Sequence, residues 1–253
     1  MYYYIFDIKK CKKRSVVADI KNHLAALGIS GEYTYPSTAY TTEELIDLGI
    51  SKKYNTIVGI GDDMIANAIA SKLVGLPEAM GFIPIEASSD LCQLIGTSSW
   101  REAANNLRFR KIAEMKVGRL ADGSVFLTSI ELDLKNPTEI TMELKDCMIQ
   151  GKAANFQIAN YNPLIRKIGE DWLDIVFQTV DPKESGFLSK ISSMLGFGKE
   201  GQNDISLIRA RSLRLFTSAQ IPILAHGNVV AKTPQFIECS DENLRLIVGK
   251  KKI

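Results

Sequence analysis

Apolar residues in the first 110 positions follow two alternating periods, which predicts strands and helices in turn. Residues 3–6, 56–60 and 81–85 are short apolar runs of the kind found in buried strands. Apolar residues recur every three or four positions, as in helices, over 16–27, 45–48, 65–73, 91–94 and 100–107. This order predicts a mostly parallel sheet with helices on both faces.

Single residues mark where several of these elements begin or end. Gly28 follows the first helical run and is expected to end that helix. Thr41 and Glu44 have the spacing of a capping box, which predicts that a helix begins there. Gly61 and Asp62 open the turn between the second strand and the helical run that follows it.

The pattern changes after about residue 112, where apolar and polar residues alternate with a period of two. The apolar members of these runs are Ile140, Met142 and Leu144; Ala154, Phe156 and Ile158; Leu173, Ile175 and Phe177; Leu213 and Leu215; and Leu244, Leu246 and Val248. Many short runs of period two predict an antiparallel sheet, most simply a β-sandwich.

The change of pattern predicts two domains. We expect an α/β domain over residues 1–112 and an all-β domain over residues 113–253, with a ligand-binding cleft between them. The C-terminal segment is a candidate to return to the first domain.

Composition limits the compartment and the partners. The 253 residues carry a formal net charge of +2, which gives no sign of a nucleic-acid-binding surface. The four cysteines form no CxxC pair, as expected of a chain in a reducing, cytoplasmic compartment rather than of a zinc site. No stretch approaches the roughly 20 apolar residues of a membrane span. Nothing in the pattern marks a subunit interface, so a homo-oligomer stays open.

Two strand-to-helix turns carry the residues best suited to chemistry. In open α/β sheets, ligands bind at the carboxyl ends of the strands, where these turns are expected to lie. Glycines there let backbone N–H groups approach phosphates, and carboxylates are suitable ligands for Mg²⁺. The alternative is purely structural: Asp63, and a serine or aspartate of the second turn, cap the helices that follow. The candidate residues are Gly59, Gly61, Asp62 and Asp63 in the first turn and Ser88, Ser89 and Asp90 in the second.

Residues 57–70 resemble the GGDGT segment of the diacylglycerol kinases and bacterial lipid kinases. Four later landmarks follow in that family's order. Residues 81–90 resemble its strand and GTGND turn, 116–126 its DLGRVNG…F entry into the second domain, 172–176 its GLLDVV strand, and 226–246 its DGE…TP…LRV ending. The resemblance implies the two-domain fold of these kinases.

The resemblance also implies an activity: ATP- and Mg²⁺-dependent phosphorylation of the hydroxyl of a diacylglycerol-like or long-chain-base lipid. It implies that His226 is the general base with Asp62 beside it, and that Asp62 and Asp90 hold the metal. The nucleotide-binding residues on this interpretation are Gly59, Gly61, Asp62, Asp63, Ser88, Ser89, Asp90 and Lys116, the last on a phosphate.

The motifs are altered where this chemistry is expected to lie. In GGDGT, Asp63 replaces a glycine and Met64 replaces the threonine. Lys116 stands at the metal-linked aspartate of DLGRV, and His226 and Asn228 replace the two acids of DGE. The alternative function is therefore a non-catalytic protein that keeps a lipid- or nucleotide-binding cleft.

Two further interpretations concern single segments. Residues 35–40 resemble a turn of the related NAD kinases, but here they precede the Gly61 turn instead of following it. An NAD-kinase-like function is therefore the minor alternative. His226 beside Gly227 also fits an ordinary hairpin turn without a chemical role.

Residues 186–198 point to a lipid surface as a partner. Their apolar members can share one helical face, and such a helix lies in a membrane interface, which predicts peripheral membrane contact. The alternatives are a helix that covers the sandwich core and a mobile flap. The apolar members are Phe187, Leu188, Ile191, Met194 and Leu195.

Overall fold

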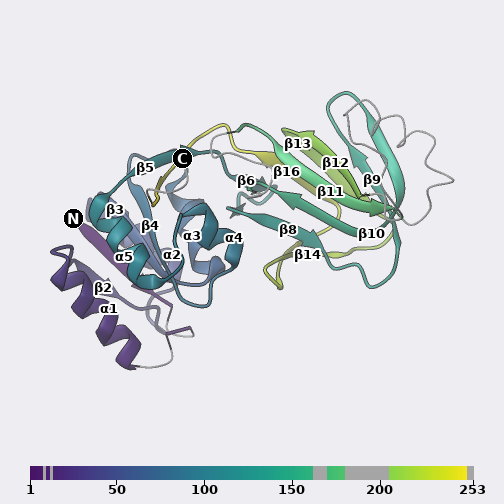
Figure 1. Cartoon of the computed structure of the whole chain (residues 1–253). Helices are drawn as coiled ribbons and strands as arrows, with labels where there is room; N and C mark the ends of the chain where they lie inside the picture. Colours follow the sequence, from purple (N-terminus) through teal and green to yellow (C-terminus); the bar gives the residue numbers. More distant parts are fainter. Residues whose placement is uncertain (8–9, 12–13, 162–169, 180–204, 250–253) are drawn as a thin grey trace.

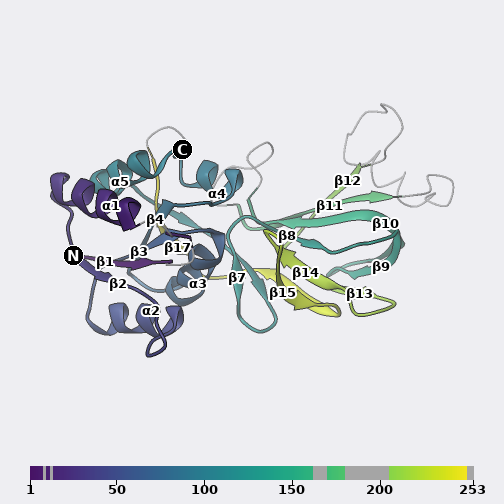
Figure 2. The same ribbon diagram turned by 90° about the horizontal axis from the view of Figure 1, so that it is seen from below.

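The chain folds around two sheets, one built largely from the first half of the sequence and one from the second (Figures 1 and 2). The structure is a computed structural model and describes residues 1–7, 10–11, 14–161, 170–179 and 205–249. The two sheets lie at opposite ends of the molecule (Figures 1 and 2).

The first sheet has six strands in the order β2-β1-β3-β4-β17-β5. All neighbouring pairs are parallel except β17 and β5, which run antiparallel. The strands are β1 (Tyr2–Phe6), β2 (Glu32–Thr34), β3 (Thr56–Gly61), β4 (Ala79–Pro84), β5 (Ile112–Met115) and β17 (Leu244–Ile247). The predicted parallel sheet is confirmed, and β1, β3 and β4 lie where the apolar runs placed them.

Helices cover both faces of this sheet, as predicted. Helices α1 (Arg14–Ala26) and α5 (Trp100–Phe109) pack on one face through Ile20, Leu24 and Leu107. The other face is covered by α2 (Thr42–Ser51), α3 (Asp63–Leu73) and α4 (Ser89–Leu94), whose buried residues join a second apolar core with Tyr3, Ile5 and Ile57. Each core buries apolar surface on one side of the same strands, which stabilises the layered arrangement.

The signals for helix ends are largely confirmed. Thr41 and Glu44 form a reciprocal capping box at the start of α2. Gly28 follows α1 with a φ of 71°, a left-handed conformation that glycine adopts without strain. The cap of α3 differs by one residue from the structural alternative, because Asp62 and not Asp63 accepts the N–H of Met64.

Among the described residues, the second sheet contains eleven antiparallel strands and curls around its own apolar core, which confirms the predicted sandwich-like domain. Along its main path the order is β15-β14-β8-β10-β9-β13-β16-β6-β7, and β11 pairs with β10 and β12. The strands are β6 (Gly118–Leu120), β7 (Val125–Phe126), β8 (Ser129–Leu132), β9 (Thr138–Glu143), β10 (Met148–Ala159), β11 (Leu173–Thr179), β12 (Ile205–Ala210), β13 (Ser212–Thr217), β14 (Pro222–Ala225), β15 (Asn228–Lys232) and β16 (Gln235–Cys239).

One apolar run lies elsewhere than its period suggested, in the first domain, to which the C-terminal segment was a candidate to return. Leu244 and Leu246 alternate like the strands of the second sheet, but β17 crosses back and inserts between β4 and β5 of the first. Leu246 pairs with Met80 on one side and Ala113 on the other. The chain therefore connects the two sheets twice, after β5 and after β16.

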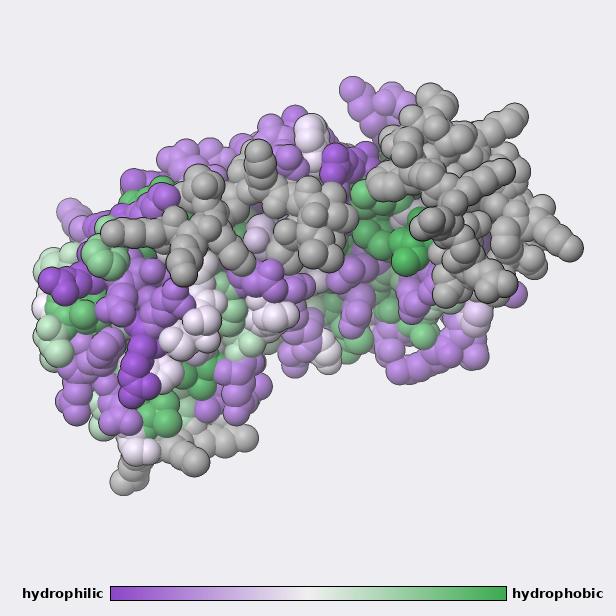
Figure 3. Space-filling model, viewed as in Figure 1, coloured by the Kyte–Doolittle hydropathy of each residue, from purple (hydrophilic) through white to green (hydrophobic). Residues whose placement is uncertain are grey.

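The surface seen in Figure 3 is mostly hydrophilic where it is coloured, and hydrophobic residues gather there in small groups. Among the described residues, no helix has the length and apolar character needed to cross a membrane. The predicted amphipathic segment 186–198 lies outside the described residues, so peripheral membrane contact stays a prediction.

Candidate functional site

The two predicted turns lie next to each other because the strands that precede them are paired. Strand β3 ends at Gly61 and β4 at Pro84, and these two residues are partners in the parallel register. The turns therefore open at the same edge of the sheet, at the carboxyl ends of the strands. Gly61 is required there, because a Cβ atom at this position would lie 2.7 Å from Cβ of Asp7.

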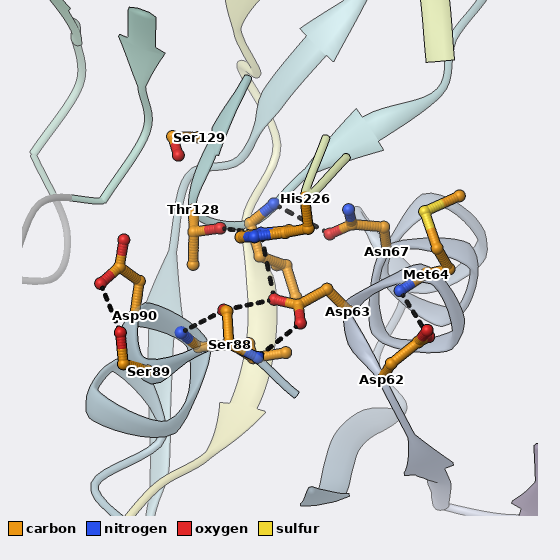
Figure 4. A network of polar contacts seen from close by, with 12 residues as sticks. Asp62, Asp63, Met64, Asn67, Ser88, Ser89, Asp90, Thr128, Ser129 and His226 are labelled. Atoms are coloured by element: carbon orange, nitrogen blue, oxygen red, sulfur yellow. Dashed lines mark hydrogen bonds and ion pairs between the residues drawn. The ribbon is translucent and has the colours of Figure 1, made fainter. Parts of the chain in front are cut away.

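Asp63 is the centre of the contacts between the turns (Figure 4). One of its carboxylate oxygens accepts the backbone N–H of Ser88 at 2.7 Å, and the other accepts the Ser88 hydroxyl at 2.6 Å. The same hydroxyl accepts the N–H of Leu91 and caps α4. Asp63 is only 4% exposed, so these hydrogen bonds replace the water that its charge would otherwise need.

His226 reaches Asp63 from the second sheet. It forms, with Gly227, a two-residue hairpin turn between β14 and β15, with φ values of 49° and 78°. Its Nε2 lies 3.0 Å from Oδ1 of Asp63 and 2.8 Å from the Thr128 hydroxyl (Figure 4). The structure thus brings the His226 hairpin of the second sheet next to the turn that carries Asp62 and Asp63, here called the acidic turn. It also confirms that His226 is a hairpin-turn residue.

Asp62 is held by contacts of its own. Oδ1 accepts the N–H of Met64 at 3.0 Å, and Oδ2 lies 3.3 Å from the Lys10 ammonium. The same ammonium lies 3.6 Å from the Glu86 carboxylate. The hydrogen bond to Asp62, followed by its charge, raises the pKa of Lys10 above the usual lysine value. Lys10 therefore supplies a fixed positive charge beside the acidic turn.

Asp90 belongs to a different part of the site. It accepts the Ser89 hydroxyl and borders a polar cavity of about 250 Å³ that His226 also lines. Burial, and secondarily the Asp90 charge, raises the pKa of Tyr161. Figure 4 shows Asp62 and Asp90 pointing away from each other, with Asp63, Ser88 and His226 between them. The remaining residues lining this cavity are Ser88, Ser89, Ser129, Ile130, Glu131, Gln157 and Leu224.

The last two predicted contacts lie away from this group. The Lys116 ammonium donates to the backbone carbonyl of Asp241. Lys116 lines neither the polar cavity nor a second cavity, of about 970 Å³, between the sheets. Gly59 lies within β3, where an added Cβ would come 2.8 Å from Cδ1 of Ile69. The absence of a side chain at Gly59 lets α3 pack closely on the sheet.

These donors do not fit the magnesium ion that the resemblance implies. Mg²⁺ requires hard oxygen ligands in near-octahedral geometry at about 2.0–2.1 Å. The two carboxylates implied as its ligands, Asp62 and Asp90, point away from each other (Figure 4), and both oxygens of Asp62 already accept a hydrogen bond or face the Lys10 ammonium. Within the described part of the chain, no three His, Cys, Asp or Glu side chains are grouped closely enough to hold a metal.

Sequence reasoning missed Lys10 and Thr128. Lys10 follows β1, so its place at the carboxyl end of a parallel strand beside two acidic turns is a signal that could have indicated it. Thr128 offered no such signal, because its contact with His226 depends on the pairing of β8 with β14, which lie far apart in the sequence.

A larger cavity of about 970 Å³ lies between the sheets. It is bordered by α3, the loop before α2, the β6–β7 hairpin and the β14–β15 hairpin. The backbone N–H groups of Val125 and Leu127 bind Ser71 and Asn67 on α3, each at 3.1 Å, and fix the β7 segment to that helix. The expected ligand cleft therefore has a counterpart in the structure.

Comparison with known proteins gives a structural answer only. No protein-family model matches the sequence, and no curated protein matches it. Among solved structures, three from Bacillus anthracis str. Sterne are similar over nearly the whole chain. Two are described as a "putative diacylglycerol kinase" and one as a diacylglycerol kinase.

The three similarities agree with one another. The TM-scores are 0.78, 0.76 and 0.78 at 16%, 16% and 15% sequence identity. The matches cover 98%, 100% and 100% of this chain and 97%, 98% and 98% of the others. Such agreement over nearly the whole chain shows that this chain has the two-part fold of those three structures.

Proposed function

We propose that this chain is a divergent lipid-kinase-like protein that binds a small molecule between its two sheets and does not transfer phosphate. The shared fold supports the lipid-kinase-like part of the proposal. The non-catalytic part rests on one observation: every carboxylate oxygen of the acidic turn is already engaged by a protein donor or cation.

This observation bears directly on the chemistry. Phosphoryl transfer needs metal ions across the phosphates and a base that can take the proton of the attacking hydroxyl. Asp62 and Asp63 have their oxygens turned to Met64, Lys10, Ser88 and His226. Nε2 of His226 is shared between the Asp63 carboxylate and the Thr128 hydroxyl, so it is not directed at a substrate.

A lipid phosphorylation assay tests the non-catalytic part of the proposal. Purified chain is incubated with Mg²⁺, radiolabelled ATP and diacylglycerol or a long-chain base in mixed micelles, and labelled lipid is counted. We expect no turnover above background, and no difference between the native chain and its Asp62→Asn and His226→Ala variants. A lipid kinase assayed in the same mixture provides the positive control.

A second measurement addresses the nucleotide alone. We expect millimolar Mg²⁺-ATP to leave the melting temperature of the native chain unchanged, since a ligand that binds only the folded state would raise it. Lipid phosphorylation that is lost in Asp62→Asn would overturn the non-catalytic proposal and establish the ATP-dependent kinase as the function.

A further inference from the structure

Aromatic rings line one face of the first two strands of the first sheet. Tyr4 and Phe6 lie two positions apart on β1 and therefore share a face, and Tyr4 pairs with Tyr33 of β2. The Tyr33 ring centroid lies 5.1 Å from that of Tyr4 and 6.2 Å from that of Phe6. Tyr35, just after β2, stacks on Phe6 at 5.2 Å. The rings thus form one continuous aromatic surface.

The ammonium group of Lys21, on α1, lies over three of these rings. Its Nζ atom is 4.8 Å from the ring centroid of Tyr33, 5.2 Å from that of Tyr35 and 5.9 Å from that of Phe6. A cation within about 6 Å of a ring centroid is attracted by the negative face of the ring. Within the described part of the chain, no carboxylate forms an ion pair with this ammonium. Ring faces therefore hold this cation in place of a carboxylate.

This group of rings is better suited to a methylated ammonium than to the ammonium that it holds. A lysine ammonium is compact and strongly hydrated, and its N–H donors prefer oxygen acceptors to ring faces. Methyl groups remove those donors and surround the charge with apolar surface, which gains free energy when it leaves water. Sets of aromatic rings bind choline and methylated lysine in this way.

The rings lie at an accessible edge of the molecule. Strand β2 is the outermost strand of the first sheet, and α1 and β2 lie at the end of the molecule away from the second sheet (Figures 1 and 2). Phe6 is fully buried, whereas Tyr33, Tyr35 and Lys21 are partly exposed. Rotation of the Lys21 side chain into solvent would therefore uncover the ring faces without a change in the backbone.

We propose that Phe6, Tyr33 and Tyr35 form a binding site for a methylated ammonium group, and that the Lys21 ammonium occupies this site when the ligand is absent. The cation of the ligand takes the place of the lysine cation over the rings. The methylated ammonium belongs either to a small molecule such as choline or to a methylated lysine of a protein. This inference goes beyond the proposed function, because none of these residues lines either cavity.

Nuclear magnetic resonance titration of the full chain tests the assignment, with the ring signals of Tyr33 and Tyr35 as the readout. The ligands are choline, its uncharged isostere with carbon in place of nitrogen, and ammonium ion. We expect choline to bind at least about fivefold more tightly than the isostere, because only choline brings a positive charge to the ring faces. Ammonium should bind more weakly than choline, because water holds it more strongly.

Two peptides that differ only in trimethylation of one lysine separate the possible sources. The trimethylated peptide should bind and the unmodified peptide should not. Tighter binding of the trimethylated peptide than of choline would indicate a protein as the source, and the reverse order would indicate a small molecule. Either order supports the site.

Variants test the rings and the lysine separately. Tyr33→Leu and Tyr35→Leu each remove one ring and should weaken choline binding by about twofold to fivefold, with Phe109→Leu, at an exposed ring of α5, as the control. Lys21→Ser removes the competing cation and should tighten choline binding by at least about threefold. Lys111→Ser, at an exposed lysine after α5, should leave it unchanged.

Three results would overturn the proposal. Equal affinities for choline and its uncharged isostere would show that the rings do not select a cation. Choline binding that both tyrosine variants leave unchanged would place the ligand elsewhere. Choline affinity that Lys21→Ser does not raise would show that the lysine ammonium does not occupy the binding site.

Discussion

The Lys10 ammonium takes the position of a counter-ion for the acidic turn. It neutralises Asp62 and Glu86 at 3.3 and 3.6 Å, so this edge of the sheet carries its own cation. Lysine presents a compact point charge, and such a charge excludes a second cation from the same carboxylates. Removing it should therefore change which ions the turn accepts.

We expect Lys10→Ala to bind Mn²⁺ at least about tenfold more tightly than the native chain, because a positive charge beside the carboxylates is lost. Mn²⁺ binding is measured by the loss of the free-ion electron paramagnetic resonance signal. Lys52→Ala, which removes the surface ion pair with Glu32, should show no gain. Equal affinities in the native chain and Lys10→Ala would show that Lys10 does not control access of metal to Asp62.

The cysteines differ in their expected reactivity. Burial, followed by the charges of Asp7 and Glu86, raises the pKa of Cys11 to about 11. The thiolate is the nucleophile, and its fraction at pH 8 is then about one in a thousand. Reaction of Cys11 with iodoacetamide should stay slow at pH 8 and accelerate as the pH rises towards 11.

Cys147 is exposed and provides the comparison. Peptide mass spectrometry after labelling at pH 8 should find Cys147 modified first and Cys11 modified only after denaturation. Cys11 labelling at the rate of Cys147 in the folded chain would contradict the burial of its thiol.

Sequence reasoning identified many residues of the site but not their partners. Asp62, Asp63, Ser88 and His226 were all candidates, and the structure brings the last three into direct contact. What could not be predicted is that they bind one another, because a hydrogen bond between Asp63 and His226 depends on the docking of two separate sheets.

Among the elements, the β11–β12 pair holds a buried charge. Asp174 of β11 is fully buried, and Oδ1 lies 2.9 Å from Nε of Arg209, its partner residue on β12. The other carboxylate oxygen has no hydrogen-bond partner among the described residues. A buried carboxylate in this state depends strongly on the one cation that it has.

Arg209→Met should lower the free energy of unfolding by about 2–3 kcal/mol, because it leaves the Asp174 charge buried and unpaired. Arg214→Met is the matched control, since the side chain of its partner Glu143 is 43% exposed and lies 3.8 Å away, and its loss should cost less than about 1 kcal/mol. Urea denaturation measures both. Equal losses of unfolding free energy in the two variants would show that burial of the Asp174 carboxylate does not make its arginine partner more important for stability.

Local periodicity predicted most elements well and their pairing poorly. The period of 3.6 placed α1, α3 and α5, and the capping box placed the start of α2. Leu244 and Leu246 were grouped with the antiparallel runs, because alternation gives the faces of a strand but not its neighbours. The short strand β2, with three residues, left too weak a pattern to be noticed.

At the scale of the whole molecule, β17 links the two halves, because it follows the second sheet in the sequence but belongs to the first sheet. It lies between β4 and β5, so the first sheet is continuous only when the last strand is in place. Leu246 is fully buried there and belongs to the same apolar core as Tyr3, Ile57 and Met80. The stability of the first half therefore depends on residues that follow the second.

Leu246→Ala should lower the free energy of unfolding by about 3 kcal/mol, as expected for a cavity left in a packed core. Ile205→Ala, at a strand position that is 68% exposed, should change it by less than about 0.5 kcal/mol. Hydrogen exchange should quicken most in β4 and β5, the two strands that pair with β17. Faster exchange confined to the second sheet would contradict the role assigned to β17.

The insertion of β17 also has a consequence for synthesis on the ribosome. The edge of β4 that β17 covers stays open until residues 244–247 emerge, after the whole second sheet has been made. At about 5–20 residues per second, that interval lasts roughly ten to thirty seconds. The nascent amino-terminal half spends that interval with one edge of β4 unpaired, and an unpaired strand edge is a template for pairing with other chains.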